Sequence, residues 1–307
     1  MTLYLPIAEL PINVFLIFGM GAAVGLISGM FGVGGGFLMT PLLIFSGIAP
    51  AIAVATMTAQ VTAASFSGAL TYYRRGALDT RLALVLTAGG LIGAALGVAA
   101  FDLLQRLGQL DVVIALAYVF FLGTVGSLMF WESIRAILRA RRGHRPNAAK
   151  PGHHPWVHKL PFKMRFPRSR IYLSVLPVLG IGAAIGFLGS VLGIGGGFML
   201  VPALIYLLRV PSSIVVGTSL MQIVLVMAGA AFMHAVSNGG VDVVLALVLM
   251  IGSTLGAQIG ASIGSQLKAE HLRVLLAVLV LGVGLRFAVD LVVTPDAPYT
   301  IESDGRS

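Results

Sequence analysis

The sequence predicts an all-α, polytopic membrane protein of about ten transmembrane segments, arranged as an inverted 5+5 repeat with short or broken second and seventh segments. Of its 307 residues, 58% are hydrophobic and 10% are charged, whereas soluble domains have roughly 45–50% apolar and about 25% charged residues. The apolar segments fall into two groups of five around one basic stretch, and both groups carry the same glycine-rich motif. These observations together indicate a duplicated membrane domain.

The apolar segments are the first element of this prediction. They cover residues 12–31, 34–48, 52–73, 82–101 and 111–131, then 171–192, 196–208, 213–236, 243–264 and 272–292. Most have the roughly 20 residues that cross a hydrocarbon core of about 30 Å. The second and seventh are shorter and contain Pro41 and Pro202, so we expect them to be broken, tilted or re-entrant. Eight crossings would result if neither spans the membrane, but we favour ten.

The internal repeat is the second element. The motif GVGGGF at 32–37 matches GIGGGF at 193–198, an offset of 161, and a proline follows each copy. Further matches, with one-residue slips, are Thr56 with Thr218, Gln60 with Gln222, Asp79 with Asp242, the string LALVL at 82–86 and 245–249, and the glycine ladders Gly89, Gly93, Gly97 and Gly252, Gly256, Gly260. We expect the ladders to be helix-packing faces.

The distribution of basic residues predicts the orientation. Eleven of the twenty Lys and Arg residues lie between Arg135 and Arg170, and such a stretch beside membrane helices favours the cytoplasm and contact with anionic lipid over nucleic-acid binding. With ten crossings, seventeen Lys and Arg residues lie inside and two outside. The two five-segment units then have opposite orientations, and both termini are external.

These boundaries predict four regions. They are a first five-segment repeat at 1–131, a basic cytoplasmic linker at 132–170, a second five-segment repeat at 171–293 and a polar external tail at 294–307.

Several kinds of chemistry are excluded by what the chain lacks. It has no cysteine, which removes disulfides, thiolate metal sites and cysteine nucleophiles. The histidines of the linker, His144, His153, His154 and His158, lie among Pro, Gly and basic residues, which favours a solvated segment over a metal site. No segment presents an HExxH helix or sets a serine beside a histidine in a buried GxSxG turn. We therefore expect no enzyme activity, no metal and no cofactor.

The glycine motif is a candidate anion site. It separates a long apolar helix from a short one, so its backbone can leave N–H groups unpaired at membrane depth, where they need a partner. Two such helix N-termini near the midplane would form an anion pocket; close helix packing is the alternative. The candidate binding residues here are Gly34, Gly35, Gly36, Gly195, Gly196 and Gly197.

Polar side chains in the third and eighth segments are further candidates. Thr56 and Gln60 lie one turn apart, as do Thr218 and Gln222, and Ser219 follows Thr218. Each pair therefore faces one direction. Neutral hydroxyl and amide donors can replace water around an oxyanion, although Ser, Thr and Gln also commonly form hydrogen bonds between membrane helices. Both interpretations stay open for the individual residues.

Few groups could couple transport to protons. Arg286 and Asp290 lie one turn apart and can pair with each other. His234, at the outer end of the eighth segment, is the most plausible titrating group, although an exposed loop histidine is the more common outcome. Protons are therefore a possible coupling ion, and the coupling mechanism stays open.

The chain resembles the sulfite exporter TauE/SafE family of membrane permeases. The resemblance rests on the paired GVGGGF and GIGGGF motifs with their prolines, on AVAT and VVGTS with Gln60 and Gln222 downstream, and on YYRRGALD and HAVSNGGVD. It implies a permease of the bacterial inner membrane that moves small anions, with sulfite, thiosulfate and organosulfonates as the suggested class. The long basic linker need not belong to the common pattern, and the family's breadth leaves the substrate open.

We therefore expect a secondary transporter that carries a small anion by alternating access of the two repeats. A passive anion channel and a non-transporting scaffold that uses the basic linker are the alternatives. The sequence does not predict the direction of transport or the oligomeric state.

Overall fold

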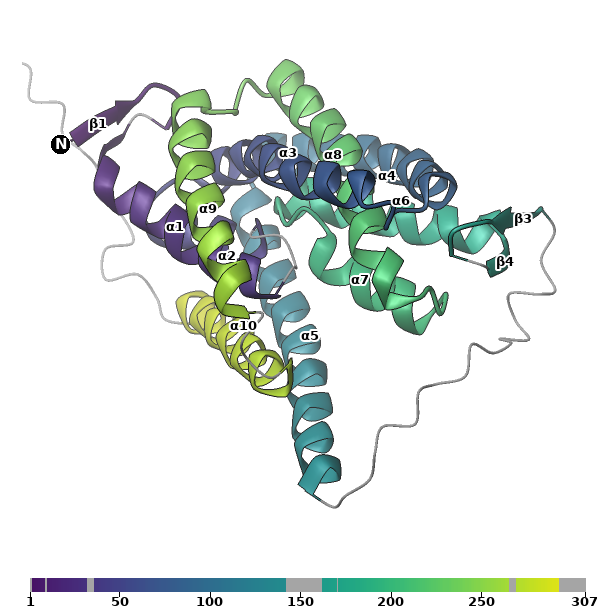
Figure 1. The fold of residues 1–307 in the computed structure, drawn as a ribbon. Helices are drawn as coiled ribbons and strands as arrows, with labels where there is room; N and C mark the ends of the chain where they lie inside the picture. The colour runs from purple at the N-terminus through teal and green to yellow at the C-terminus, as the bar shows by residue number, and fades with distance from the viewer. Residues whose placement is uncertain are drawn as a thin grey trace, which may run out of the picture.

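Each half of the computed structural model is a β-hairpin followed by five helices (Figure 1). The structure describes residues 2–8, 10–31, 36–141, 162–169, 171–264 and 269–292. The first half comprises β1 (Thr2–Leu5), β2 (Leu10–Asn13), α1 (Val14–Phe31), α2 (Gly36–Phe45), α3 (Pro50–Arg74), α4 (Thr80–Arg106) and α5 (Leu110–Arg141). The second comprises β3 (Lys163–Phe166), β4 (Ile171–Ser174), α6 (Val175–Leu192), α7 (Gly197–Tyr206), α8 (Ser212–Ser237), α9 (Val243–Gly264) and α10 (Ala269–Val292).

Helices α2 and α7 are as short as the sequence predicted. Each has 10 residues and contains the expected proline. At a rise of about 1.5 Å per residue, such a helix is about 15 Å long, half of a hydrocarbon core of about 30 Å. Gly193 ends α6 with φ of 68°, the left-handed conformation that glycine adopts without a steric penalty. The chain can therefore turn sharply between α6 and α7.

The two hairpins were not predicted. β1 pairs with β2 in antiparallel register from Thr2 opposite Asn13, and β3 pairs with β4 from Lys163 opposite Ser174. The second hairpin thus begins inside the stretch that the sequence assigned to the linker. The hairpins lie at opposite ends of the bundle in Figure 1, which is the arrangement that two oppositely oriented halves would produce.

Helices pair mainly across the two halves. The most extensive contacts join α1 with α9, α4 with α6, α5 with α10 and α3 with α8. The glycine ladders make these approaches possible: a Cβ at Gly93 would overlap the carbonyl oxygen of Ala183, and one at Gly256 would overlap that of Ala22. The predicted packing role of the ladders is confirmed, because the backbones of neighbouring helices touch at these glycines.

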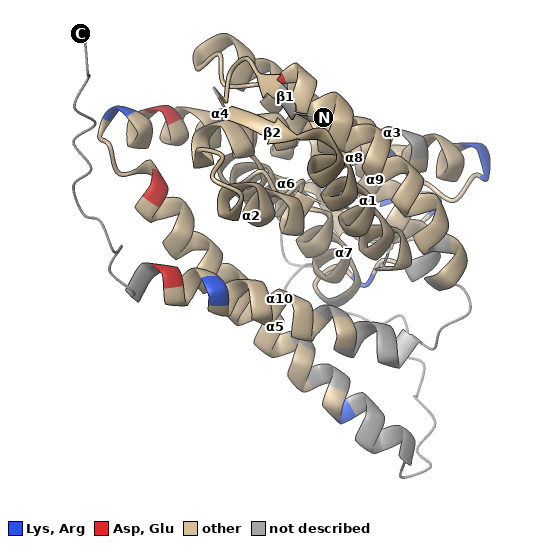
Figure 2. Ribbon diagram, turned by 90° about the vertical axis from the view of Figure 1, so that its left-hand side faces the viewer, with Lys and Arg blue, Asp and Glu red and all other residues tan. Residues whose placement is uncertain are grey.

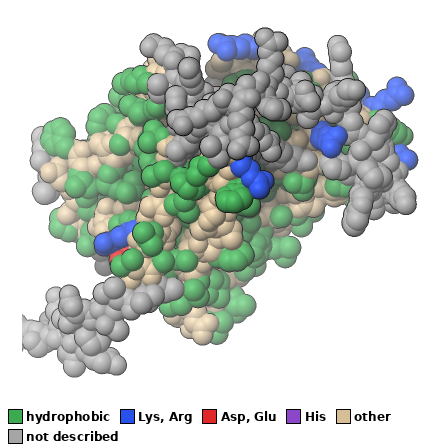
Figure 3. All heavy atoms as spheres, turned by 90° about the horizontal axis from the view of Figure 1, so that it is seen from below, with side chains coloured by type: hydrophobic (Ala, Val, Ile, Leu, Met, Phe, Trp, Pro, Cys, Tyr) green, Lys and Arg blue, Asp and Glu red, His purple; other side chains and the backbone are tan. Residues whose placement is uncertain are grey.

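The helices and the molecular surface are those of a multi-pass membrane protein. Among the described residues, five helices are long and apolar enough to cross a membrane, namely Thr80–Arg106, Leu110–Leu128, Val175–Leu192, Ile214–Ser237 and Val243–Gly260. Large hydrophobic side chains such as Phe120 (74% exposed) point outward, and Figure 3 shows hydrophobic side chains over much of one face. In Figure 2 the charged positions lie mainly near helix ends and in loops. The count of ten crossings stays a prediction.

Candidate functional site

A polar cavity of about 330 Å³ lies between the α1–α9 pair and the α3–α8 pair. It extends from Gln60 near the middle of α3 to Thr71 and Tyr72 near its end. Gln258 of α9 lies on the wall and is exposed, so the cavity communicates with the surface. Its lining residues are Val24, Gly25, Ser28, Gly29, Gln60, Val61, Ala64, Ser65, Gly68, Thr71, Tyr72, Val216, Leu220, Ser253, Thr254, Ala257 and Gln258.

The polar groups of this lining are neutral, because none of its residues is Lys, Arg, Asp, Glu or His. Gln60 is 2% exposed, and its Nε2 donates to Oγ of Ser253 at 2.7 Å. That hydroxyl in turn donates to the carbonyl of Met250 at 3.2 Å, and the hydroxyl of Thr254 donates to the same carbonyl at 2.7 Å. The single protons of both hydroxyls are thus used within α9, whereas the Gln60 amide is held in place by Ser253 and carries a second N–H that can be offered to a ligand.

Gln60 is the predicted binding residue that lines this cavity, and most of the other polar lining residues were not predicted. Ser253, Thr254 and Gln258 lie beside the glycine ladder of α9, and their polar side chains in a predicted transmembrane segment were the signal that could have found them. Ser28 adjoins Gly29 in the same way on α1. These residues form one wall of the cavity because α1 packs against α9.

The two predicted threonines anchor one half of the protein to the other. Thr56 accepts a hydrogen bond from the backbone N–H of Asp242 at 3.0 Å, and Thr218 accepts one from the N–H of Asp79 at 3.1 Å. All four residues are at most 1% exposed, and neither threonine belongs to the cavity lining. In the conformation described, their hydroxyls serve contacts between helices.

The two aspartates continue these anchors to the hairpins. Asp79 caps α4 by accepting from the N–H of Leu82 at 3.2 Å, and its other oxygen accepts from the N–H and hydroxyl of Ser169 in the β3–β4 turn at 2.9 and 2.8 Å. Asp242 accepts from the N–H groups of Leu245 and, in the β1–β2 turn, Ile7, at 3.0 and 3.1 Å. Each hairpin is therefore held by a buried carboxylate of the other half.

Gln222 and Ser219 lie away from the cavity lining. The hydroxyl of Ser219 donates to the carbonyl of Val216 within α8 at 2.9 Å. Gln222 is 1% exposed, and its Oε1 has no hydrogen-bond partner among the described residues. The position that corresponds to Ser253 in the other half is Gly90, where a Cβ would lie 2.8 Å from Nε2 of Gln222. The partner that orients Gln60 is thus replaced by a glycine beside Gln222.

The described residues of the two glycine motifs meet inside the molecule. Phe37 and Phe198, the last residues of the two motifs, stack with ring centroids 4.8 Å apart, and a Cβ at Gly36 would lie 2.9 Å from the carbonyl oxygen of Ile194. Gly195 and Gly196 both have φ of 73°, in the left-handed region that side chains disfavour. Gly34 and Gly35 lie outside the described residues.

The described glycines of the motifs lie behind the cavity wall. A Cβ at Gly195 would overlap the side chain of Val61, which lines the cavity. Gly36, Gly196 and Gly197 are likewise buried and are not among the lining residues. The N-terminus of α7 has no side-chain cap, so its first N–H groups have the character of an anion site. An anion-binding role of Gly36 and Gly195 to Gly197 stays a prediction.

The interface that corresponds to this cavity by the internal repeat is closed. Ala94 of α4 and four residues of α8, namely Ile223, Val226, Met227 and Ala230, form one buried cluster with Val61 and are each at most 2% exposed. We call the first five residues the apolar plug. By the repeat offsets of 163 for α4 and 162 for α8, they correspond to Ala257, Val61, Ala64, Ser65 and Gly68, all of which line the polar cavity. Of these two corresponding interfaces between the halves, α3–α9 is therefore open and α4–α8 is closed.

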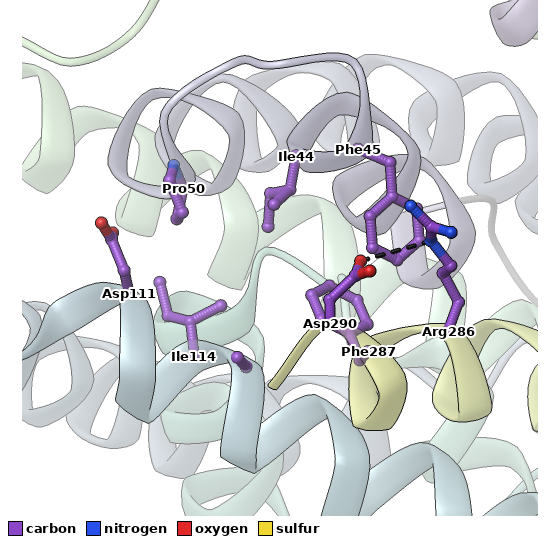
Figure 4. A pocket seen from close by; sticks show the side chains of 9 residues that line it. Ile44, Phe45, Pro50, Asp111, Ile114, Arg286, Phe287 and Asp290 are labelled. Carbon is purple, nitrogen blue, oxygen red and sulfur yellow. Dashed lines mark ion pairs between the residues drawn. The ribbon is translucent and has the colours of Figure 1, made fainter. Parts of the chain in front are cut away.

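A second cavity, of about 410 Å³, lies between α2, α5 and α10 (Figure 4). Arg286 and Asp290 pair there at 3.3 Å, as predicted, and the guanidinium of Arg286 also lies over the ring of Phe45. With Asp111 on the opposite wall, two carboxylates stand against one guanidinium. This surplus of negative charge makes the cavity a poor anion site in spite of its larger volume.

The apolar helices define a class, the multi-pass membrane proteins, and similarity to known proteins defines the family. Residues 17–287 match the family described as Sulfite exporter TauE/SafE. The chain therefore belongs to the TauE/SafE family, and the predicted resemblance is confirmed. This membership points to a membrane transporter and away from an enzyme.

Relatives in several organisms carry similar descriptions. The probable membrane transporter protein YjnA of Bacillus subtilis (strain 168) is 31% identical over 87% of this chain and 96% of its own length. A probable membrane transporter protein of Xylella fastidiosa (strain 9a5c) is 32% identical over 67% of each chain. Sulfite exporter TauE/SafE family protein 5 of Arabidopsis thaliana is 34% identical over 36% of this chain and 23% of its own. No solved structure shows significant similarity to the chain.

Proposed function

We propose that this protein is a secondary transporter that carries a small sulfur oxyanion, such as sulfite, thiosulfate or an organosulfonate, by alternating access of its two halves. The observation that carries the proposal is the polar cavity around Gln60, which offers the second N–H of the Gln60 amide as an oriented neutral donor and contains no carboxylate. Neutral donors can replace the hydration of an oxyanion without holding it as tightly as a fixed cation would. Membership of the TauE/SafE family supports the choice of sulfur anions.

The dimensions and surroundings of the cavity suit such a ligand. A water molecule takes about 30 Å³ of liquid, so a volume of about 330 Å³ holds on the order of ten waters, or a small oxyanion with part of its hydration shell. Arg74 and Arg75 follow Thr71 and Tyr72 within one turn at the end of α3 and are exposed. Their positive charge would raise the local concentration of anions at this end of the cavity.

Alternating access is supported by the contrast between the cavity and the apolar plug. The plug occupies the α4–α8 interface, and the cavity occupies the corresponding α3–α9 interface. In an inverted repeat, an exchange of these two arrangements would close one entrance and open the other. We propose ten crossings in the inner membrane of a bacterium, with the basic linker and the mouth of the cavity on the cytoplasmic side and both termini outside.

Flux measurements test the proposal. Purified protein in liposomes should give saturable uptake of labelled sulfite, thiosulfate or taurine, measured with and without a pH gradient. Gln60→Leu, which removes an oriented donor to an anion, should raise KM by about tenfold or more. Gln105→Leu is the matched control, since Gln105 is exposed near the end of α4.

The outcomes separate the alternatives. The absence of saturable flux for every anion would reject the transporter, and flux that rises linearly with concentration would favour a passive channel. Replacement of residues 142–161, between the last residue of α5 and the second hairpin, by a Gly/Ser segment of the same length should leave flux intact. A scaffold that recruits partners through the linker would lose its function instead.

A further inference from the structure

The plugged side of the bundle contains a buried histidine that the proposed transport cycle has not used. His234 lies in the last turn of α8 and is 0% exposed. By the repeat offset of 162 it corresponds to Tyr72, which lines the open cavity. The prediction that His234 is more commonly an exposed loop residue is therefore wrong. His234 thus lies at the end of the closed α4–α8 interface, at the position equivalent to that of Tyr72 in the open cavity.

The contacts of the ring define its tautomer. Nε2 lies 3.0 Å from the carbonyl oxygen of Ser190 in α6. Because a carbonyl only accepts hydrogen bonds, Nε2 carries a proton, and in the neutral ring Nδ1 is left as the basic nitrogen. Nδ1 lies 3.5 Å from the amide nitrogen of Asn238, and the ring packs edge-on against Phe101 with centroids 4.8 Å apart. The next proton to bind would bind at Nδ1.

One charged group faces this ring among the described residues. Asp102 of α4 is close enough to interact electrostatically with His234, and its Oδ1 is buried without a hydrogen-bond partner. From α6 the ring meets the Ser190 carbonyl, and from its own helix it meets Asn238. An imidazolium would therefore have a carboxylate beside it, while its new N–H would face the amide nitrogen of Asn238.

We propose that His234 is a proton-binding site that controls the apolar plug, so that a proton bound at Nδ1 opens the closed side of the transporter. In the closed state, the proton at Nδ1 would face the amide N–H donor of Asn238, which repels it. Protonation would also bury a cation beside the apolar plug. Both effects destabilise the closed packing. An open state hydrates the cation and leaves it paired with Asp102, so the proton binds the open state more tightly and shifts the population toward it.

This inference rests on the proposed transport function, but the opening of the plug can be measured without any substrate. The chain has no cysteine, so single cysteines can report access directly. Val226→Cys places a thiol in the plug, and Ala64→Cys places one at the corresponding position in the open cavity. Labelling by a small water-soluble thiol reagent is followed in detergent and normalised to the same variant unfolded at the same pH.

The expected result follows from the titration range of histidine. Between about pH 7.5 and about pH 5.5, labelling of Val226→Cys should accelerate by about tenfold or more, while that of Ala64→Cys should stay constant or slow. Added His234→Asn should remove the acceleration. The proposal is overturned if Val226→Cys shows no acceleration with His234 present, or if the acceleration survives His234→Asn.

A second variant keeps the test decisive if His234→Asn does not fold. Asp102→Asn retains the histidine but removes the carboxylate that favours the imidazolium, so the acceleration should need a more acidic pH. An unchanged pH response in this variant would contradict the role of Asp102. If labelling responds as expected but the protein gives no anion uptake into liposomes, the proposed function fails and the proton site stands. Saturable flux without a labelling response supports the transport function and rejects the proton site.

Discussion

The open α3–α9 interface and the closed α4–α8 interface are built on matching positions with different side chains. At four of five positions the plug carries the larger residue: Ile223 against Val61, Val226 against Ala64, Met227 against Ser65 and Ala230 against Gly68. Each buried CH₂ group stabilises by about 0.8 kcal/mol. Side-chain size alone can therefore close one of two interfaces that share the same repeated backbone.

The anchors between the halves show the opposite pattern. Thr56 with Asp242 and Thr218 with Asp79 make the same hydrogen bond at 3.0 and 3.1 Å, and each aspartate then holds a hairpin turn. The scaffold is thus symmetric where the two halves are joined and asymmetric at the cavity and the apolar plug.

Truncation of the plug should destabilise the protein far more than truncation at its open counterpart. Met227→Ala removes a side chain that is 1% exposed and should lower the free energy of unfolding by about 2–5 kcal/mol. Ser65→Ala, at the matching cavity position, should cost less than about 1 kcal/mol. Thermal unfolding in detergent measures both. Equal losses at the two positions would show that the interfaces do not differ in packing.

The two anchors should be of equal strength. Thr56→Val and Thr218→Val each leave a buried backbone N–H without its acceptor, so each should lower the free energy of unfolding by about 1–3 kcal/mol. Measurement by the same unfolding assay should give values within about 0.5 kcal/mol of each other. A large loss in only one variant would contradict the symmetric scaffold.

Filling the cavity should make the open side resemble the plug. Ala64→Val combined with Ser65→Met transfers the plug residues to α3 and should reduce the saturable flux of the transported anion by about tenfold or more, equivalent to about 1.4 kcal/mol. Ala99→Val, at an exposed position of α4, is the control and should leave flux unchanged. Wild-type flux in the double variant would mean that this cavity is not on the transport path.

The charged cavity of Figure 4 should contribute least. The side chains of Arg286 and Asp290 are 62% and 41% exposed, and exposed ion pairs contribute only about 0–1 kcal/mol. Arg286→Gln should therefore change the free energy of unfolding by less than about 1 kcal/mol and leave KM for the anion near its wild-type value. A strong rise in KM would move the anion site from the polar cavity to this one.

Sequence alone was enough to predict the membrane class, the two five-helix halves, the short second and seventh helices and the packing faces of the glycine ladders. These features depend on composition, on self-similarity and on residues close together in the chain, such as Gly89, Gly93 and Gly97 on one face of α4. The polar density of one segment also singled out Gln60.

Tertiary contacts, in contrast, determine which polar residues face the cavity and which join the two halves. Thr56 and Gln60 lie one turn apart and looked equivalent, yet Thr56 binds Asp242 whereas Gln60 lines the cavity beside Ser253. Their partners lie 186 and 193 residues away in the chain. The burial of His234 and the closure of one entrance arise in the same way, because contacts between helices of different halves leave no local pattern in the sequence.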